Sequence, residues 1–341
     1  MIDLIVVGGG PVGLATAIEA ASAGMSVTLF EPRATPVDKA CGEGLMPAAR
    51  AALHRLGVDP PGVEFRGIHY LAAGSQAVAE FRAGPGLGVR RTDLSAALAE
   101  RAAALGVHRI AAPAPAPVQD RDGITVAGTT ARWLVAADGL HSPTRRALGL
   151  DRPPPRTAAR YGLRRHYRVP PWTDLVEVHW AERAEAYLTP VAADVVGVAV
   201  LGPAGEGFEH WLTRFPAVVE RLAGAEPIGP VRGAGPLRQV ARRRVHGRAL
   251  LVGDAAGYVD ALTGEGIRTG LACAQAAVAA VMTGQPATYE RQWRRLTRSY
   301  RLLTSTLVMS SRSTLLRRQI VTAARALPPV FGAAVESLAH A

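Results

Sequence analysis

The order of apolar and polar positions in the first thirty residues predicts a strand, a helix and a second strand. Residues 2–7 form a short apolar run rich in β-branched side chains, which is typical of a strand buried on both faces of a parallel sheet. The alanine-rich pattern of residues 11–24 is helical, because a proline opens it and a glycine closes it. Residues 25–30 are again apolar, so the opening stretch predicts a strand–turn–helix–strand unit.

The patterns further along predict an α/β domain interrupted by an antiparallel sheet. Residues 161–201 alternate polar and apolar positions with turns between the segments, which favours an inserted antiparallel sheet over another parallel repeat. An apolar run at 248–252 then returns the chain to the first domain and leads into a long alanine-rich helix. Further helices are expected at 47–56 and 91–105, and further strands at 63–71, 78–81, 107–110, 124–126 and 133–137.

The fold class expected from these patterns is α/β, with a doubly wound dinucleotide-binding domain, an inserted antiparallel substrate sheet and C-terminal helices. We expect its segments to be 1–157 (first part of the dinucleotide-binding domain, with small strand insertions), 158–247 (substrate domain), 248–285 (return segment) and 286–341 (helical tail). Residues 289–318 predict a helix that is basic on one face and apolar on another. Such a helix either packs on the substrate domain or lies in a membrane interface, and the pattern leaves both open.

Composition narrows the class of protein. No run of about twenty apolar residues occurs and the chain starts with a strand, so we expect neither a membrane-spanning helix nor a signal peptide, and a cytoplasmic location. Two cysteines are too few for a disulfide framework. The formal charge of +11 comes almost entirely from arginine, and no nucleic-acid motif accompanies it, so we expect no nucleic-acid partner. Peripheral membrane contact through the C-terminal helices fits the charge better.

The first turn carries a phosphate-binding pattern. Gly8, Gly10 and Gly13 have the G-x-G-x-x-G spacing, which allows a tight turn, close approach of the backbone to a pyrophosphate and close helix–strand packing. The helix that follows offers free N–H groups and a positive dipole end to phosphates. Glu31 ends the second strand, where an acid accepts a hydrogen bond from a ribose hydroxyl. These residues predict a dinucleotide site without choosing between FAD and NAD.

The long loop after the second strand holds unusual side chains close together. Lys39 is the only lysine of the chain, and Cys41 and Glu43 follow it within four residues. A lysine is a compact charge whose pKa shifts on burial, so Lys39 is a candidate for chemistry, although a solvated loop lysine fits the pattern equally well. Cys41 is either a small buried filler or a reactive thiol.

Two later strands also end in acidic turns. Asp138 follows the strand at 133–137, and Asp254 follows the strand at 248–252, so both carboxylates are expected at the carboxyl edge of the sheet, where ligands bind in doubly wound folds. A glycine-rich turn at 264–266 then opens a long helix. Its N-terminus is suited to stabilising negative charge on a flavin ring.

Three motifs in this order carry a family resemblance. GGGPVG at 8–13, ADGLHSPTRR at 137–146 and GDAAG…GEGI at 253–267 resemble the flavoprotein superfamily of para-hydroxybenzoate hydroxylase, geranylgeranyl reductase and the flavin-dependent halogenases, over roughly residues 1–285. The resemblance implies a Rossmann-like, glutathione-reductase type domain that binds FAD, with NAD(P)H as a transient electron donor and no metal. The cofactor residues that it implies are Gly8, Gly10, Pro11, Val12, Gly13, Glu31, Pro32, Arg33, Arg91, Asp138, Gly253, Asp254, Gly264, Gly266 and Ile267.

The details of the motifs resemble the geranylgeranyl reductase branch most. The segment 187–190 lacks the tryptophans of the halogenases and also departs from the reductases. The resemblance therefore favours an NAD(P)H-dependent monooxygenase that hydroxylates an apolar aromatic, polyketide or phenolic-lipid substrate. The alternative is reduction of C=C bonds in a prenyl or lipid substrate, and a third hypothesis is a flavin-binding protein without turnover. The catalytic candidates are Lys39, Cys41, Glu43 and Tyr187.

Overall fold

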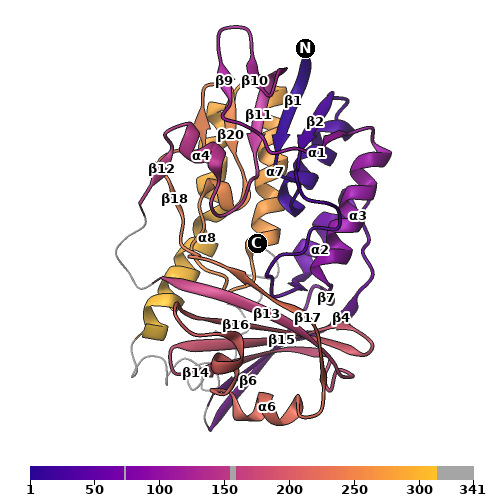
Figure 1. The fold of residues 1–341 in the computed structure, drawn as a ribbon, viewed down its shortest axis with the longest axis vertical. Helices are drawn as coiled ribbons and strands as arrows, with labels where there is room; N and C mark the ends of the chain where they lie inside the picture. Colours follow the sequence, from indigo (N-terminus) through magenta and orange to yellow (C-terminus); the bar gives the residue numbers. More distant parts are fainter. Residues whose placement is uncertain (73, 154–158, 313–341) are drawn as a thin grey trace.

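Two lobes lie one above the other in the computed structural model, which describes residues 1–72, 74–153 and 159–312 (Figure 1). The chain begins in the upper lobe, and segments from both halves of the sequence meet there. The predicted boundary at 157/158 falls in residues 154–158, outside the described residues.

The upper lobe is built on a mostly parallel sheet. Its strand order is β19-β20-β11-β1-β2-β8, in which β1 lies centrally and pairs in parallel with β2 and β11. The strands are β1 (Ile2–Val7), β2 (Val27–Phe30), β8 (His108–Ile110), β11 (Thr129–Ala136), β19 (Val245–His246) and β20 (Ala249–Leu251), with β9 (Val118–Gln119) and β10 (Ile124–Val126) added beside β11. Leu4, Ile5 and Val6 are fully buried, as the unbroken apolar run predicts.

Helices pack around this sheet. The helix α1 contacts both α3 and α7, and small alanines on α1 allow the close approach. The helices of this lobe are α1 (Pro11–Ser22), α2 (Pro47–Arg55), α3 (Arg91–Ala104), α4 (Pro143–Ala147), α7 (Gly266–Met282) and α8 (Ala287–Arg312), and a short 3-10 turn η1 (Gly253–Ala256) precedes α7. The doubly wound arrangement expected from the sequence is therefore confirmed.

The lower lobe is a seven-stranded sheet in the order β17-β13-β16-β15-β14-β5-β6. Its strands are β5 (Gly67–Ala72), β6 (Ser75–Glu80), β13 (Arg160–Arg168), β14 (Leu175–Ala181), β15 (Ala184–Ala192), β16 (Val195–Pro203) and β17 (Glu226–Ala234). The antiparallel sheet expected over 161–201 is confirmed. The sequence pattern did not anticipate that β5 and β6 join this sheet, because the parallel pairing of β5 with β14 joins segments about a hundred residues apart.

Short elements complete the two lobes. The helices α5 (Phe208–Leu212) and α6 (Pro216–Arg221) cover one face of the lower sheet through an apolar cluster that includes Trp211 and Val198. A small sheet of β3 (Gly44–Leu45), β7 (Gly86–Gly88) and β4 (Val63–Phe65) lies where the lobes meet, and β12 (Asp151–Arg152) pairs with β18 (Val240–Ala241).

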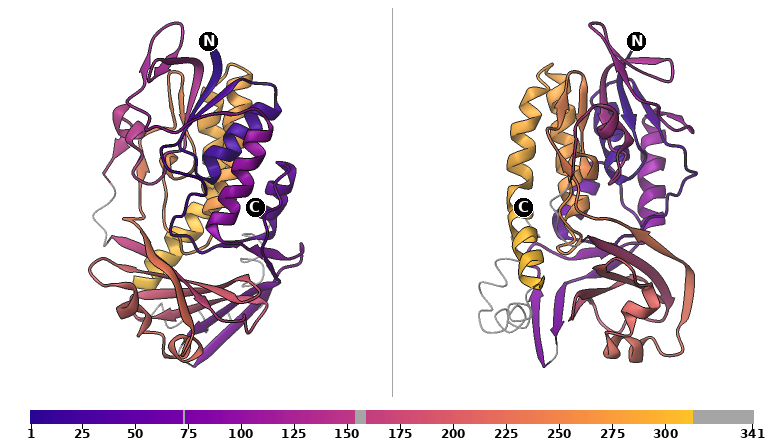
Figure 2. Two further views of the ribbon diagram at one scale, coloured as in Figure 1. Left: turned by 45° about the vertical axis from the view of Figure 1, so that its right-hand side comes forward. Right: turned by 60° about the vertical axis from the view of Figure 1, so that its left-hand side comes forward.

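The helix α8 runs along the outer edge of the upper lobe and reaches the lower sheet (Figure 2). Tyr289 and Trp293 are buried against the upper core, and Val308 is buried in the cluster that contains β5 and β14 residues. Residues 313–318 of the predicted helix and the rest of the tail lie outside the described residues. No helix in the described part of the chain is long and apolar enough to cross a bilayer.

Candidate active site and cofactor cleft

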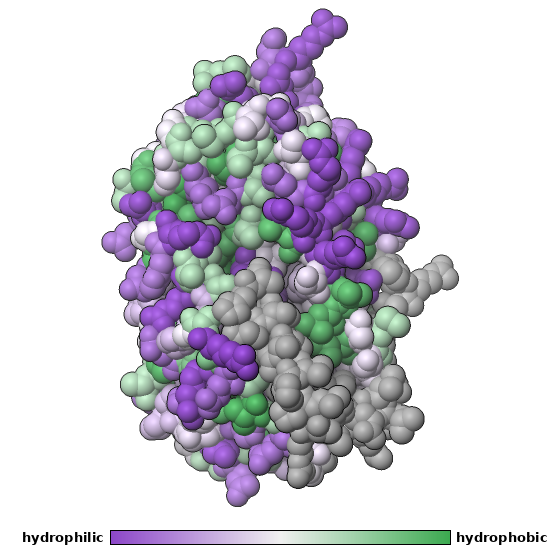
Figure 3. Space-filling model, turned by 180° about the vertical axis from the view of Figure 1, so that it is seen from behind, coloured by the Kyte–Doolittle hydropathy of each residue, from purple (hydrophilic) through white to green (hydrophobic). Residues whose placement is uncertain are grey.

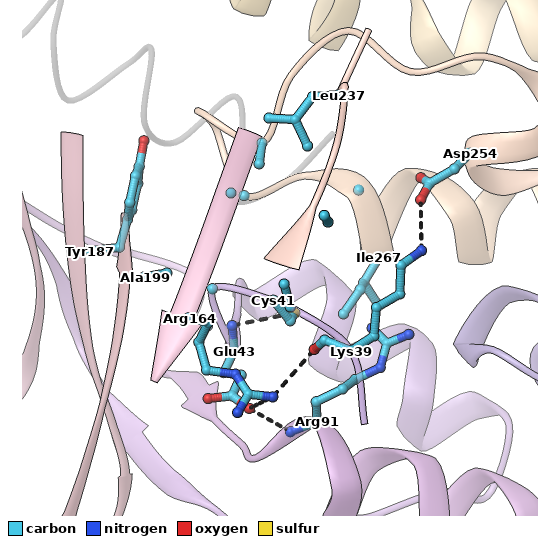
Figure 4. A pocket seen from close by; sticks show the side chains of 18 of the residues that line it. Lys39, Cys41, Glu43, Arg91, Arg164, Tyr187, Ala199, Leu237, Asp254 and Ile267 are labelled. Carbon is cyan, nitrogen blue, oxygen red and sulfur yellow. Dashed lines mark hydrogen bonds and ion pairs between the residues drawn. The ribbon is translucent and has the colours of Figure 1, made fainter. Parts of the chain in front are cut away.

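A cavity of about 280 Å³ lies between the two lobes (Figure 4). The glycine-rich turns after β1 and η1 line it from above, and side chains of the lower sheet line it from below. The three motif regions of the sequence therefore meet at one cleft, although they lie more than a hundred residues apart.

The turn between β1 and α1 is shaped to receive a phosphate. Gly8 has φ +102°, and a Cβ on Gly13 would lie 1.8 Å from the Gly8 carbonyl oxygen, so both positions require glycine. A Cβ on Gly10 would meet only the Arg91 Nη2 atom, at 3.9 Å, so the cleft is open beside it. The N-terminus of α1 has no side-chain cap, and Pro11 and Val12 line the cleft with it. Free N–H groups beside an open space fit the pyrophosphate of FAD.

Glu31 lies buried at the end of β2. Its carboxylate accepts hydrogen bonds from the Gly9 N–H at 2.8 Å and from the Arg33 backbone N–H, Nε and Nη2 at 2.9, 2.8 and 2.8 Å. Burial opposes ionisation, but the bonds from Arg33 and Gly9 outweigh it and lower the pKa of the Glu31 carboxyl. These four bonds use the acceptor capacity of the carboxylate, so a ribose hydroxyl would displace an Arg33 contact.

Asp138 organises the loop that follows β11. Its Oδ2 accepts from the Thr144 N–H at 2.9 Å and its Oδ1 accepts from the Ser142 hydroxyl, which caps α4. In the same motif the buried Arg145 donates to the carbonyls of Leu140 and Ala255, at 3.0 and 3.1 Å. The motif thus ties the Asp138 loop to η1, and Asp138 itself lines the cleft.

Asp254 and Lys39 face each other across the cleft. The Lys39 Nζ and Asp254 Oδ2 atoms are 3.9 Å apart, and each side chain is about a third exposed, at 32% and 31% (Figure 4). Beyond them Gly264, with φ +68°, turns the chain into α7, whose uncapped N-terminus brings Gly266 and Ile267 to the cleft. Gly253 also lines the cleft, but Pro32 does not appear among the residues that line it.

Glu43 holds the predicted loop to both lobes. Its Oε1 accepts from the Arg91 backbone N–H at 2.8 Å and its Oε2 lies 2.7 Å from His166 Nε2. The Arg164 Nη1 lies 3.1 Å from His166 Nδ1, and because a guanidinium can only donate, Nδ1 accepts and Nε2–H donates to Glu43. Both carboxylate oxygens are occupied and buried, a geometry suited to positioning the loop. A Cβ on Gly197 would lie 2.9 Å from Glu43 Oε2, so this glycine makes room for the bond.

Arg164 was absent from the sequence candidates. It lies between Asp38, which its Nη2 contacts, and the His166–Glu43 pair. The run YGLRRHYR offers several arginines that look equivalent in sequence. Strand alternation was the available signal, because residues two apart share a face and Gly162, Arg164 and His166 therefore lie together.

Cys41 and Tyr187 occupy different parts of the cleft. The Cys41 sulfur accepts a hydrogen bond from the Glu43 N–H at 3.4 Å, and the side chain is partly exposed. The Tyr187 hydroxyl donates to the Leu262 carbonyl at 2.8 Å, and burial raises its pKa well above the ordinary value. Tyr187 therefore stays a neutral phenol that ties β15 to the loop before α7.

The lower half of the cleft is apolar. Four of its lining residues form one buried apolar cluster. Phe65 comes from β4 of the small sheet, and Ile68, Val176 and Val178 come from β5 and β14 of the seven-stranded sheet. Such a wall accommodates a bulky apolar group beside the cofactor side. In the described ranges, no group of three His, Cys, Asp or Glu side chains could hold a metal ion.

Comparisons with known proteins agree with the geometry. Residues 1–288 match a family model described as FAD binding domain. The menaquinone reductase of Mycobacterium tuberculosis is 34% identical over 163 residues, which cover 43% of this chain and 40% of that protein. The menaquinone reductase of Mycolicibacterium smegmatis is 30% identical over 343 residues, which cover 85% of this chain and 79% of that protein.

Two further similarities extend this picture. A digeranylgeranylglycerophospholipid reductase of Methanopyrus kandleri is 31% identical over 304 residues, covering 81% of this chain and 79% of that protein. Among solved structures, the flavin-dependent brominase Bmp2 has a TM-score of 0.83 at 17% identity, covering 99% of this chain and 93% of that chain. At that identity the likeness shows the fold alone.

Proposed function

Since this chain belongs to the FAD binding domain family, we propose that it is an FAD-dependent oxidoreductase that acts on a bulky apolar substrate with NAD(P)H as electron donor. The observation that carries the proposal is the cleft itself, in which a phosphate cradle and an apolar wall face one space. When bound, FAD supplies the two-electron chemistry, and the protein supplies binding and orientation.

The chain's own residues divide the work of binding. The N-terminus of α1 would hold the pyrophosphate, Glu31 the adenosine ribose and Asp254 the ribityl chain. The uncapped N-terminus of α7 would supply partial positive charge to stabilise negative charge on the flavin. On the opposite side, the apolar wall excludes water from the substrate.

For the reaction type, we favour reduction of a C=C bond in an isoprenoid or lipid-like substrate. Of the four relatives that match about four fifths of the chain or more, three are named as reductases, of menaquinone or of a digeranylgeranyl phospholipid, and one is named a dialkyldecalin synthase, so the majority supports this choice. Hydroxylation, which the sequence favoured, is the second candidate, because 187–190 departs from the reductase pattern. In either reaction we assign Lys39 and Cys41 as candidate proton donors, because both line the cleft.

Oxygen separates the two reactions. A reductase should convert a menaquinone or prenyl-lipid substrate anaerobically, with NAD(P)H oxidised in step with product. A hydroxylase should consume O₂ in step with NAD(P)H and should stop without it. Yellow protein that NAD(P)H fails to bleach would contradict both and would leave a flavin-binding protein without turnover.

The loop side chains can be tested separately from cofactor binding. Lys39→Ala and Cys41→Ala should each slow flavin reduction or product formation while FAD stays bound, by about 100-fold or more for a group that transfers a proton. Stopped-flow absorbance resolves the two half-reactions. Wild-type turnover in both variants would leave the loop with a structural role only.

We also propose that α8 contacts an anionic membrane surface. Its exposed positions include Arg291, Arg295 and Arg298, followed by Leu302 and Met309, which are 68% and 70% exposed. Seen from behind, hydrophilic and hydrophobic residues are interspersed on the surface of the molecule (Figure 3). Basic residues next to exposed apolar side chains suit the surface of a lipid bilayer. Co-sedimentation with vesicles containing phosphatidylglycerol should exceed that with phosphatidylcholine alone, and equal sedimentation would contradict the contact.

A further inference from the structure

A second, smaller cavity of about 60 Å³ lies behind η1, between α7 and α8. The Gln239–Tyr258 bridge closes one side of it. Gly253, Asp254, Tyr258 and Gly266 line both this cavity and the cofactor cleft, so they form a shared wall. We refer to it as the α7–α8 cavity.

Cationic side chains outnumber acidic ones in the lining of the α7–α8 cavity. Three arginines line it, Arg238, Arg244 and Arg301, against one acid, Asp254. Arg244 is paired with Glu290 at 3.1 Å. Within the described ranges Arg238 and Arg301 have no ion-pair partner, and Asp254 already has Lys39 at 3.9 Å. The cavity therefore carries an excess of positive charge.

Two of these cations share one aromatic ring. The guanidinium carbons of Arg244 and Arg301 lie 3.5 and 5.0 Å from the centre of the Trp293 indole. Burial lowers the pKa of Arg244, Glu290 opposes that effect, and the charge of Arg301 adds to it. Like charges this close repel unless an anion lies between them. Glu290 pairs with Arg244 and Arg294 but not with Arg301. An anion in the cavity would therefore relieve the repulsion at Arg301.

The size of the α7–α8 cavity limits what it can hold. Its volume of about 60 Å³ exceeds the roughly 10–15 Å³ that one water molecule needs and is well below the roughly 150 Å³ of a cavity that binds benzene, so it suits one small oxyanion rather than an aromatic ring. Burial raises the pKa of Tyr258 well above its ordinary value, so this lining phenol remains a neutral donor. Guanidinium groups and neutral donors around a small space are the groups that bind phosphate.

We propose that the α7–α8 cavity binds a phosphate group next to the cofactor cleft, presented by a larger molecule, either a nucleotide or a phospholipid. The two sources share the same chemistry at the site. This site is separate from the pyrophosphate cradle at α1, because it lies on the opposite side of the η1 wall.

Calorimetric titration of the FAD-loaded protein with inorganic phosphate tests the site, since FAD fills the α1 cradle in that state. The wild type should bind phosphate saturably, and Arg301→Gln combined with Arg238→Gln should weaken the affinity at least about 10-fold, as loss of charged hydrogen bonds predicts. Arg221→Gln is the matched control. The guanidinium carbon of Arg221 lies 5.0 Å from the centre of the Trp172 ring in the lower lobe, so this arginine also contacts a tryptophan but lies far from the α7–α8 cavity. Equal loss in the control, or no saturable binding by the wild type, would overturn the proposal.

Competition then distinguishes the two sources. If NADPH but not NADH displaces phosphate, the site binds the extra 2′-phosphate of a nucleotide. If both displace it, the site binds the pyrophosphate that the two dinucleotides have in common. Displacement by phosphatidylglycerol vesicles but not by phosphatidylcholine vesicles supports a phospholipid. If none of these displaces phosphate, a larger donor molecule is excluded and that part of the proposal fails.

Discussion

The two halves of the cleft offer a ligand different groups, mainly backbone N–H groups above and apolar side chains below. In the upper half, glycine turns and the N-termini of α1 and α7 face the space, with charged side chains such as Asp138 and Asp254 beside them. The lower half is made of side chains, with apolar residues from the lower sheet. A site made of backbone turns requires glycine at set positions in the sequence, because a Cβ at Gly13, for example, has no room. A side-chain wall admits many residues of similar size, so the upper half is specified by sequence and the lower half mainly by shape.

Adding one methyl group to the upper half should have the largest effect. In Gly13→Ala the new Cβ would lie 1.8 Å from the Gly8 carbonyl oxygen, a backbone atom that cannot move without opening the turn. We expect a loss of more than about 3 kcal/mol of stability and of the bound flavin. Gly207→Ala is the control, since nothing lies within 4 Å of its Cβ. Flavin absorbance per protein and urea unfolding check both, and a stable, yellow Gly13→Ala variant would contradict the comparison.

Removing the carboxylate of Asp254 should empty the cofactor site without unfolding the protein. A charged hydrogen bond is worth about 1.5–3 kcal/mol, so Asp254→Ala should weaken FAD affinity about 10- to 100-fold or more. Asp59→Ala, at an exposed position that pairs with His54, should keep its flavin. Equilibrium dialysis of FAD measures the difference, and stoichiometric flavin in the Asp254 variant would overturn its assignment.

The N-terminus of α7 should make stability depend on pH. Burial raises the pKa of Glu265 to about 7 from its usual 4.5, although Arg268 opposes the shift. Between these values the folded protein binds more protons than the unfolded chain, so stability falls as pH rises through this window and levels off above it. At high pH, Glu265→Gln should therefore recover up to about 3 kcal/mol of the stability that the wild type loses.

Urea unfolding at about pH 5 and about pH 8 measures that effect. The gain of Glu265→Gln over the wild type should be larger at the higher pH. Glu100→Gln, at an exposed position of α3, should show no such difference. An equal gain at both pH values would show that Glu265 is ionised throughout the window.

The smallest effect is expected in the lower half. Tyr187→Phe removes the hydroxyl that donates to the Leu262 carbonyl, and leaving that acceptor unpaired should cost about 1–2 kcal/mol. Flavin content should stay at the wild-type level. Tyr161→Phe, which loses no hydrogen bond within the described part of the chain, is the matched control. Loss of FAD from Tyr187→Phe would show that the two halves are not separable.

The same difference decides what the sequence could predict. The βαβ unit, the antiparallel sheet and the dinucleotide-binding turn were predictable, because periodicity and glycine spacing are local properties. The choice of FAD rested on the family resemblance. The pairing of β5 with β14 was not, because it joins distant segments of equal propensity. The partners of Glu43 were also hidden, since the bond to His166 crosses 123 positions of sequence. The sequence singled out Glu43 as an acid in an unusual loop, but only the fold shows that it binds His166 and the Arg91 backbone.

The strands β5 and β6 have a consequence for dividing the protein into pieces. They belong to the lower sheet but lie between α2 and α3 in the chain, so the chain enters the lower lobe twice. A gene fragment that begins at residue 159 and ends at 247 would lack both strands and would leave β14 as a bare edge. Such an edge pairs readily with other copies and promotes aggregation. The lower lobe is therefore not a transplantable module, and exchange of substrate domains between relatives would have to carry residues 63–88 as well.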